Sequence, residues 1–394
     1  MLWREDFSVS KVLFVTNDFG PRAGGIETFI TGLIERLPKG SVIVYTSTQA
    51  VSPEIIRSYD EKWQRDFGAI VIRDRAKILL PTPRVGFNLA KLVRQYSPET
   101  ACFGAAAPLG LLAPALRRAG IKRIVSLTHG HEVWWAKVFP FSLALHRIGS
   151  SIDALTFLGE FTRAAIAAAV SPKAAAAMVK IAPGIDIEHF SPSSEGVTSR
   201  SLPEDLGLAD KQLIVSVGRL VHRKGQDRLI VSLPLVQKKF PSAHLLLIGQ
   251  GPYLEKLQSR ARKFGVEAAV TFIGRVQYAD LPAYIRAADI FAMPSRSRFF
   301  GLEVEGLGIV YLEASACALP VIAGKSGGAP DAVIEGVTGL VVDGTQVVEI
   351  AQAICLLLAD PDRARAMGAA GRAWILEEWS WENWSAKFRQ LLAI

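Results

Sequence analysis

One pattern constrains the fold of this chain more than any other: short apolar runs alternate with helical patterns along most of the sequence. The pattern fills the first half and restarts at Leu213. Alternation of this kind is typical of a parallel, doubly wound sheet covered by helices. The sequence therefore predicts the α/β class, with two Rossmann-like halves. The expected strands are 11–16, 42–46, 69–72, 100–103, 124–128, 154–158, a run from 213, 245–248, 270–272, 290–293, 320–323 and 339–342.

The length of the chain predicts two domains. Its 394 residues exceed what one hydrophobic core usually serves. The polar stretch 191–201 is typical of a linker. We therefore expect an N-terminal domain over 1–195, a C-terminal domain over 196–377, and a final helix over 378–394.

The net charge of +8 belongs to the N-terminal half. Residues 1–185 hold 23 Lys and Arg against 14 Asp and Glu, or +9, and the remainder holds 22 against 23, or −1. An excess of this size indicates an acidic partner, either a nucleic acid or an anionic membrane surface. The sequence shows no helix-turn-helix, zinc-finger or aromatic RNA-binding motif, so we expect the membrane surface and no nucleic acid.

The compartment is predicted from short segments. The charged residues 3–6 precede no apolar signal region, and the three cysteines have no metal or redox spacing. We expect a cytoplasmic protein that is peripheral on the cytoplasmic face of the plasma membrane. Two segments suit that contact: 134–141, a loop-like run with four aromatic residues and a lysine, and 73–80, which is basic and apolar.

Two glutamates, Glu305 and Glu313, stand eight residues apart across a glycine-rich turn that leads into a helix. Glycines in the turn let the backbone approach a ligand, and the first N–H groups of the helix are available to it. Carboxylates suit hydroxyl groups and amides suit phosphate, so a sugar nucleotide fits this element. The backbone positions expected to take part are Leu307, Gly308, Ile309 and Val310.

A basic loop follows the apolar strand that begins the second half. Arg219 and Lys224 lie in it, at the carboxyl end of a strand, where open α/β sheets bind ligands. Arg219 offers a bidentate fork to a phosphate and Lys224 a point charge. These cations suit a phosphate group without a metal. The one Asp-x-Asp spelling, 360–362, is typical of a helix N-cap followed by proline.

Six motifs, in this order, resemble the retaining glycosyltransferases of family 4, which have the GT-B fold. Within that family, the motifs 128–132, 292–296 and 304–313 look most like the GDP-mannose-dependent phosphatidylinositol monomannoside mannosyltransferases. The resemblance spans nearly the whole chain. The six motifs are Val15–Ile26, Thr128-His-Gly-His-Glu132, Pro183-Gly-Ile-Asp186, the Gly-Arg-Leu…Arg-Lys-Gly loop at 218–225, Leu247-Ile-Gly-Gln-Gly251 and the Glu-x7-Glu element.

The resemblance implies two Rossmann-like domains facing a central cleft, with the C-terminal helix crossing back to the first domain. It implies GDP-mannose as donor and a phospholipid glycoside as acceptor. Arg219 and Lys224, with the amides of Gly24 and Gly25, would stabilise the leaving diphosphate without a metal. Glu313 would hold the ribose hydroxyls, Glu305 would reach the sugar or its phosphate, and the backbone at Val276 would meet the base. A histidine, His129 or His131, would lie beside the reacting sugar, and we prefer His129 because it follows the strand directly.

Other functions stay open. The runner-up is a family 4 transferase with another donor sugar or a soluble acceptor, since the segment 298–302 carries two phenylalanines where the family has small residues. A different class is a non-catalytic protein that binds sugar nucleotides. A dehydrogenase is disfavoured because Leu254 stands where the nucleotide fingerprint needs its third glycine.

Overall fold

The computed structural model describes residues 11–22, 24–192 and 206–394. The chain divides into two compact units: the first comprises Met1–Gly184 and Trp381–Ile394, and the second comprises Ile185–Ser380. The charged segment 3–6, most of the expected linker 191–201 and the expected domain boundary at 195/196 lie outside the described residues.

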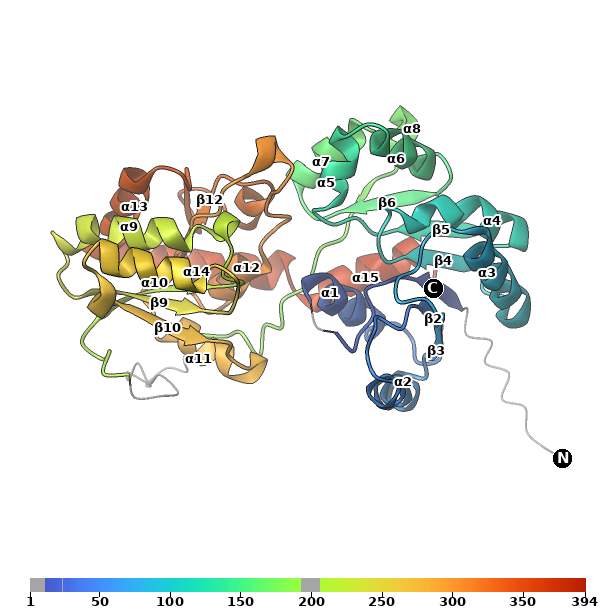
Figure 1. Ribbon diagram of the computed structural model, residues 1–394, viewed down its shortest axis with the longest axis horizontal. Helices are drawn as coiled ribbons and strands as arrows, with labels where there is room; N and C mark the ends of the chain where they lie inside the picture. The colour runs from blue at the N-terminus through green and yellow to red at the C-terminus, as the bar shows by residue number, and fades with distance from the viewer. Residues whose placement is uncertain (1–10, 23, 193–205) are drawn as a thin grey trace. The chain divides into compact units, whose positions relative to one another are not determined.

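The first unit is built on a seven-stranded sheet in the order β3-β2-β1-β4-β5-β6-β7 (Figure 1). All neighbouring strands run parallel. The central strands are continuous apolar runs because helices cover both faces of a parallel sheet. The strands are β1 Val12–Val15, β2 Val42–Thr46, β3 Ile70–Arg73, β4 Thr100–Phe103, β5 Arg123–Ser126, β6 Ala154–Phe157 and β7 Val179–Lys180.

The helices of the first unit lie on the two faces of this sheet. The amphipathic helix α3 places Val85, Leu89 and Val93 in one core with β1 and β2. Helices α6 and α7 close a second core over β6. The helices are α1 Gly25–Ile34, α2 Pro53–Phe67, α3 Pro83–Tyr96, α4 Ala113–Ala119, α5 Glu132–Lys137, α6 Phe141–Gly149, α7 Glu160–Ala167 and α8 Pro172–Ala176.

The last helix, α15 (Trp381–Leu392), belongs to the first unit and lies beside α1 (Figure 1). Its terminal carbonyls are held by the sheet, since Thr100 Oγ1 donates to Leu392 O at 3.0 Å and Arg123 Nε to Leu391 O at 2.6 Å. The Trp381 ring lies so close to Gly32 that an added Cβ there would meet it at 2.4 Å. The expected return of the final helix to the first domain is confirmed.

The second unit has a six-stranded parallel sheet in the order β10-β9-β8-β11-β12-β13, with helices on both faces. This is the Rossmann order, with its switch point between β8 and β11. Its strands are β8 Gln212–Val217, β9 Ala243–Ile248, β10 Val270–Gly274, β11 Ile290–Met293, β12 Val321–Gly324 and β13 Gly339–Val342. Its helices are α9 Gln226–Gln237, α10 Leu254–Lys263, α11 Leu281–Arg286, α12 Ile309–Ala316, α13 Val347–Ala359 and α14 Pro361–Glu378.

The strand predictions are confirmed, and the structure adds the two-residue strand β7, which is too short to give a periodic signal. The helix cap expected at 360–362 is also confirmed, because the Asp360 side chain accepts the N–H of Arg363 at 3.0 Å and Pro361 opens α14. In the part of the chain that the structure describes, no helix is both long and apolar enough to cross a bilayer.

The structure corrects one detail in each of the two surface segments. The run 134–141 is not a loop: Trp134 and Trp135 lie in α5, and Phe141, which begins α6, packs on both rings with centroid distances of 4.5 and 4.9 Å. Within 73–80, Arg73 does not add to a surface patch, because its guanidinium is buried and donates to Asp60 and to the carbonyls of Ser47 and Gly20. The rest of the segment is basic and apolar at the surface as expected, since its exposed residues are Arg75, Lys77, Ile78 and Leu80.

Candidate functional site

In the second unit, the loop after β8 contacts the loop after β11 at Gly225. Gly225 has φ 78° and approaches Pro294 so closely that a Cβ would meet its carbonyl oxygen at 2.0 Å. Arg296 donates its backbone N–H to Arg223 O at 2.8 Å, and its buried guanidinium pairs with Asp227 at 2.9 Å. Contacts within the protein therefore hold the basic loop 218–225 in place without a ligand.

This packing brings Lys224 and Glu305 together. Lys224 Nζ lies 2.9 Å from Glu305 Oε2, and both side chains are buried. Arg223 also pairs with Glu305 and, at 3.9 Å, with Glu303. Burial alone would raise the pKa of Glu305, but the charges of Lys224 and Arg223 outweigh it and hold that pKa below its ordinary value. Glu305 is thus an ionised carboxylate that orients two cations.

Glu313 has the opposite electrostatic environment. It lies in α12, and the residue directly before this helix, Gly308, has a left-handed backbone conformation with φ 83°. Burial raises the pKa of Glu313 to about 7, and Lys224 opposes that shift only in part. One site therefore holds an ionised carboxylate and one that titrates near neutral pH. Both carboxyl groups interact electrostatically with Lys224.

The remaining expected donor residues of this unit lie at the carboxyl ends of neighbouring strands. Arg219 is exposed in the loop after β8, and Val276 is half-buried just beyond β10. Leu307 is buried, and Gly308, Ile309 and Val310 form the half-buried start of α12. Lys224 pairs with Glu305, and its positive charge also acts on Glu313. Among the described residues, no contact joins the Arg219 side chain to Lys224 or to either glutamate.

One residue of the site was missed from the sequence, and one segment that the sequence singled out is now placed. Arg223 was read only as part of the basic loop, although it pairs with Glu305 as Lys224 does; its place beside Lys224 was the available signal. The phenylalanines at 298–302 lie at an exposed turn closed by Arg298 and Glu303, whose side chains pair at 3.1 Å. Both phenylalanines are exposed, and the Arg298 guanidinium lies 4.6 Å from the Phe299 ring centroid.

In the first unit, Gly24 and Gly25 stand at the start of α1. Gly24 is the N-cap, and a Cβ on it would meet Glu27 Oε2 at 2.3 Å, whereas a Cβ on Gly25 would meet nothing within 4 Å. The first turn of this helix is therefore open on the side of Gly25. Nearby, burial and then the charge of Glu27 raise the pKa of Asp18 to about 6.

The two histidines follow β5 and have different environments. His129 is buried, and its Nε2–H donates to Gly104 O at 2.7 Å. Burial lowers its pKa, so the neutral ring is favoured. His131 is 40% exposed and its Nε2 lies 3.2 Å from Glu132 Oε1. Glu132 is buried and accepts the backbone N–H of His129 at 2.7 Å, which holds the loop.

The second unit thus offers cations for a diphosphate, carboxylates for hydroxyl groups and the start of a helix for an anion. The first unit offers a neutral imidazole in a fixed loop. Within the described residues, no group of three or more His, Cys, Asp or Glu side chains is placed to hold a metal ion.

Comparisons with known proteins place these residues in a family context. A family model described as "Glycosyl transferases group 1" matches residues 199–374. The chain is 45% identical to a GDP-mannose-dependent alpha-(1-6)-phosphatidylinositol monomannoside mannosyltransferase of Mycolicibacterium smegmatis, covering 97% of this chain and 98% of that protein. A Mycobacterium tuberculosis protein of the same name is 43% identical, with 98% of each chain covered.

Solved structures share the fold at lower identity. HepE from Anabaena in complex with UDP has a TM-score of 0.78 at 21% identity, covering 97% of this chain and 99% of that one. Sucrose-phosphate synthase from Thermosynechococcus elongatus has a TM-score of 0.74 at 23% identity, covering 97% and 98%. These likenesses support the fold alone, which is GT-B.

Proposed function

This chain belongs to the glycosyl transferases group 1 family, and we propose that it transfers mannose from GDP-mannose to a phosphatidylinositol monomannoside acceptor. The observation that carries the proposal is the 45% identity over 97% of the chain to a relative named for that reaction. The buried Lys224–Glu305 pair and the neighbouring Glu313 supply groups of the kind that such a donor requires.

We propose the following roles on the donor side. Lys224 and Arg219 bind the diphosphate, and Arg223, already paired with Glu305, adds positive charge beside them. Glu305 holds Lys224 and Arg223 and reaches the mannose, and Glu313 accepts hydrogen bonds from the ribose hydroxyls. The start of α12, at Leu307 to Val310, and the Gly24–Gly25 start of α1 donate backbone N–H groups to the donor phosphates.

The reaction is a displacement at the anomeric carbon of mannose. The bond from that carbon to the phosphate oxygen breaks, and a bond to the acceptor hydroxyl oxygen forms. The hydroxyl proton passes to the departing phosphate, and GDP leaves with the bonding electrons. Cations beside the phosphate stabilise the charge that develops as the bond breaks, which is where Lys224 and Arg219 act. We propose attack from the same face, with retention and without a metal.

We assign the acceptor side to the first unit. His129, neutral and fixed by Gly104 through its Nε2–H, can accept a single hydrogen bond through Nδ1 from a sugar hydroxyl, and His131 is the exposed second candidate. Glu132 positions both, because it holds the backbone of His129 and pairs with His131.

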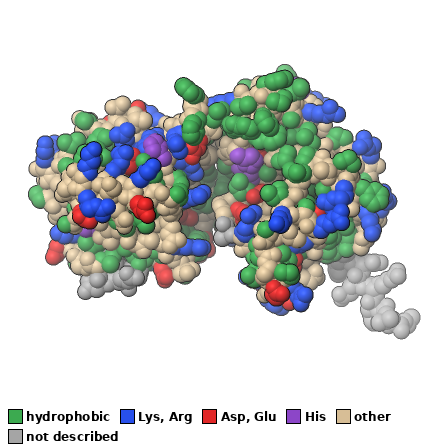
Figure 2. Space-filling view, in the orientation of Figure 1, with side chains coloured by type: hydrophobic (Ala, Val, Ile, Leu, Met, Phe, Trp, Pro, Cys, Tyr) green, Lys and Arg blue, Asp and Glu red, His purple; other side chains and the backbone are tan. Residues whose placement is uncertain are grey.

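We also propose that the first unit docks on an anionic membrane from the cytoplasmic side. Phe139, in the turn between α5 and α6, is 78% exposed, and Leu143, in the first turn of α6, is 63% exposed. Lys137 and Arg147 flank them. Figure 2 shows hydrophobic side chains gathered over the region where Figure 1 labels α5 to α8. An apolar turn with basic neighbours suits the headgroup region.

The experiment that tests the proposal measures both binding and turnover. Purified protein is offered GDP-mannose, UDP-glucose and UDP-galactose, each with phosphatidylinositol monomannoside, and labelled sugar in the lipid fraction is counted. Lipid labelling from GDP-mannose alone supports the proposal. Labelling from another donor favours the alternative transferase. GDP-mannose binding without turnover favours the non-catalytic protein.

A further inference from the structure

A second pocket of the first unit, away from the residues assigned above, is built from β2, β3 and α3. It has a volume of about 540 Å³, which is in the range of small-ligand sites. Its charged lining residues are Arg73, Asp74, Arg75, Arg84 and Lys91. Figure 2 shows lysine and arginine side chains gathered over the part of the first unit where Figure 1 labels β2, β3 and α3.

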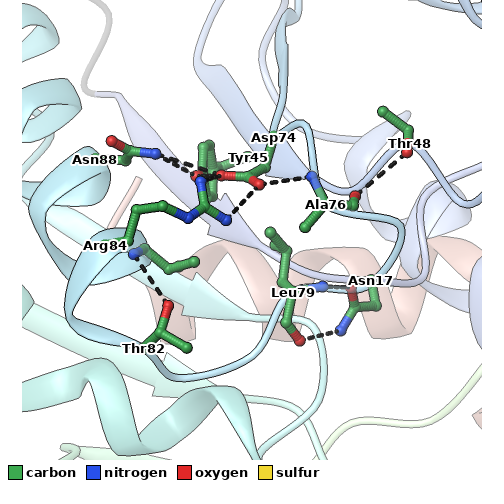
Figure 3. Close-up of polar contacts among 10 residues, drawn as sticks. Asn17, Tyr45, Thr48, Asp74, Ala76, Leu79, Thr82, Arg84 and Asn88 are labelled. Carbon is green, nitrogen blue, oxygen red and sulfur yellow. Dashed lines mark hydrogen bonds and ion pairs between the residues drawn. The ribbon is translucent and has the colours of Figure 1, made fainter.

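Asp74 and its partners form a fixed base for this pocket (Figure 3). The buried Asp74 carboxylate receives two hydrogen bonds of 2.8 Å from Arg84, and Tyr45 and Asn88 also donate to it. The Arg84 guanidinium holds the pKa of Asp74 well below its usual range. The pair is therefore ionised at any physiological pH, and its own charges cancel.

The same carboxylate positions Arg75. Asp74 Oδ1 accepts the N–H of Ala76 at 2.8 Å, which closes a tight turn around Arg75. The Thr48 hydroxyl donates to Ala76 O at 3.3 Å (Figure 3), and the Thr48 backbone N–H donates to the same oxygen at 3.1 Å, which ties that turn to the residues just after β2. The backbone on both sides of Arg75 is thus held, and its exposed side chain starts from a fixed point.

The charge that remains at the pocket is positive. Asp74 offsets Arg84, and Asp60 pairs with Arg73 at 2.7 Å, so the lining cations that these carboxylates leave uncompensated are Arg75 and Lys91. Asn88 and Gln95 add amide groups that can bond hydroxyls. A basic surface that only faces water does not require a buried carboxylate with several hydrogen-bond partners beneath it, because burying such a network costs desolvation free energy.

We propose that this pocket binds a phosphate ester of a small polyol, with Arg75 and Lys91 on the phosphate and Asn88 and Gln95 on the hydroxyls. Such a group occurs as the headgroup of an inositol phospholipid or as a free sugar or inositol phosphate. The acceptor of the proposed reaction carries such a headgroup, so the inference rests on the proposed function for its ligand class. The calorimetric test below measures binding at this pocket and not transfer, so its failure would leave the proposed reaction standing.

The test is isothermal titration calorimetry of the full chain with myo-inositol 1-phosphate as the probe. Wild type binds, and Arg75→Gln combined with Lys91→Gln binds about tenfold or more weakly, since each lost contact joins two charged groups. The control Arg118→Gln removes one exposed arginine from α4 of the same unit and binds as wild type does. Far-ultraviolet circular dichroism checks that all variants are folded.

Vesicle sedimentation distinguishes the two sources of the phosphate ester. If the double variant also loses binding to phosphatidylinositol vesicles, relative to phosphatidylcholine vesicles, the source is a lipid headgroup. If it loses only the soluble probe, the source is a free phosphate ester. Equal binding of myo-inositol 1-phosphate by wild type and the double variant, or no binding by wild type, overturns the proposal.

Discussion

Replacement of Lys224 by alanine tests the donor chemistry. Lys224 is buried, and its Nζ lies 2.9 Å from Glu305 Oε2. Bulk water therefore cannot take the place of the ammonium group unless the surrounding residues rearrange. Loss of one charged contact to a leaving phosphate costs about 2–4 kcal/mol in the transition state, or roughly thirty- to a thousandfold in rate. We expect kcat to fall by that factor in Lys224→Ala.

The fold should survive this change. Breaking a buried ion pair commonly costs about 3–5 kcal/mol because one charge is left uncompensated. Glu305 keeps Arg223 as a partner, so the loss of unfolding free energy should lie below that range. Thermal unfolding is measured beside steady-state kinetics with GDP-mannose, which separates a catalytic loss from a folding loss.

The matched control is Lys238→Ala, an exposed lysine directly after α9 in the same unit. It should keep wild-type kcat and KM. Full activity of Lys224→Ala under conditions where Lys238→Ala is also active would refute the phosphate role. A loss of activity accompanied by an equal loss in Lys238→Ala would show that charge removal in general, not this contact, is responsible.

Three other outcomes follow from the account. Activity should persist in excess EDTA, because Lys224 and Arg219 meet the charge of the leaving group; loss on chelation, restored by Mg²⁺, contradicts this. Burial raises the pKa of Glu313 from 4.5 to about 7, so its contribution to stability is present below pH 4.5 and lost as the pH rises through 7. Glu313→Gln should therefore gain melting temperature relative to wild type across that window, and a constant difference would be evidence against it. Replacing Phe139 and Leu143 together by serine should weaken sedimentation with phosphatidylinositol vesicles several-fold; undiminished binding would exclude this turn as the docking element.

The sheets could be predicted from sequence because their strands are buried on both faces. A run such as Leu245–Ile248 is apolar throughout, so it indicates a buried strand whatever surrounds it in the sequence. Strand β7 lacks such a run and depends on pairing with β6, which lies far from it in the chain. Its existence is set by tertiary packing, which local sequence does not encode.

Side-chain roles were predictable only where partners are close in sequence or in a recognised motif. Arg73 looked like a surface cation because Asp60, its partner, belongs to a different element. The tryptophans at 134 and 135 suggested a lipid interface, since two adjacent large rings are hard to bury in one core, but Phe141 packs on both. Long-range contacts of this kind decide burial, and spacing does not reveal them.

The central claim is that mannose moves from GDP-mannose to phosphatidylinositol monomannoside. The most direct measurement supplies GDP-mannose with either phosphatidylinositol or phosphatidylinositol monomannoside and analyses the lipid product by mass spectrometry and proton NMR. The account predicts one added hexose on the monomannoside, in the α configuration, and little or no product from phosphatidylinositol. A β-linked product, or a preference for unmannosylated phosphatidylinositol, would contradict it.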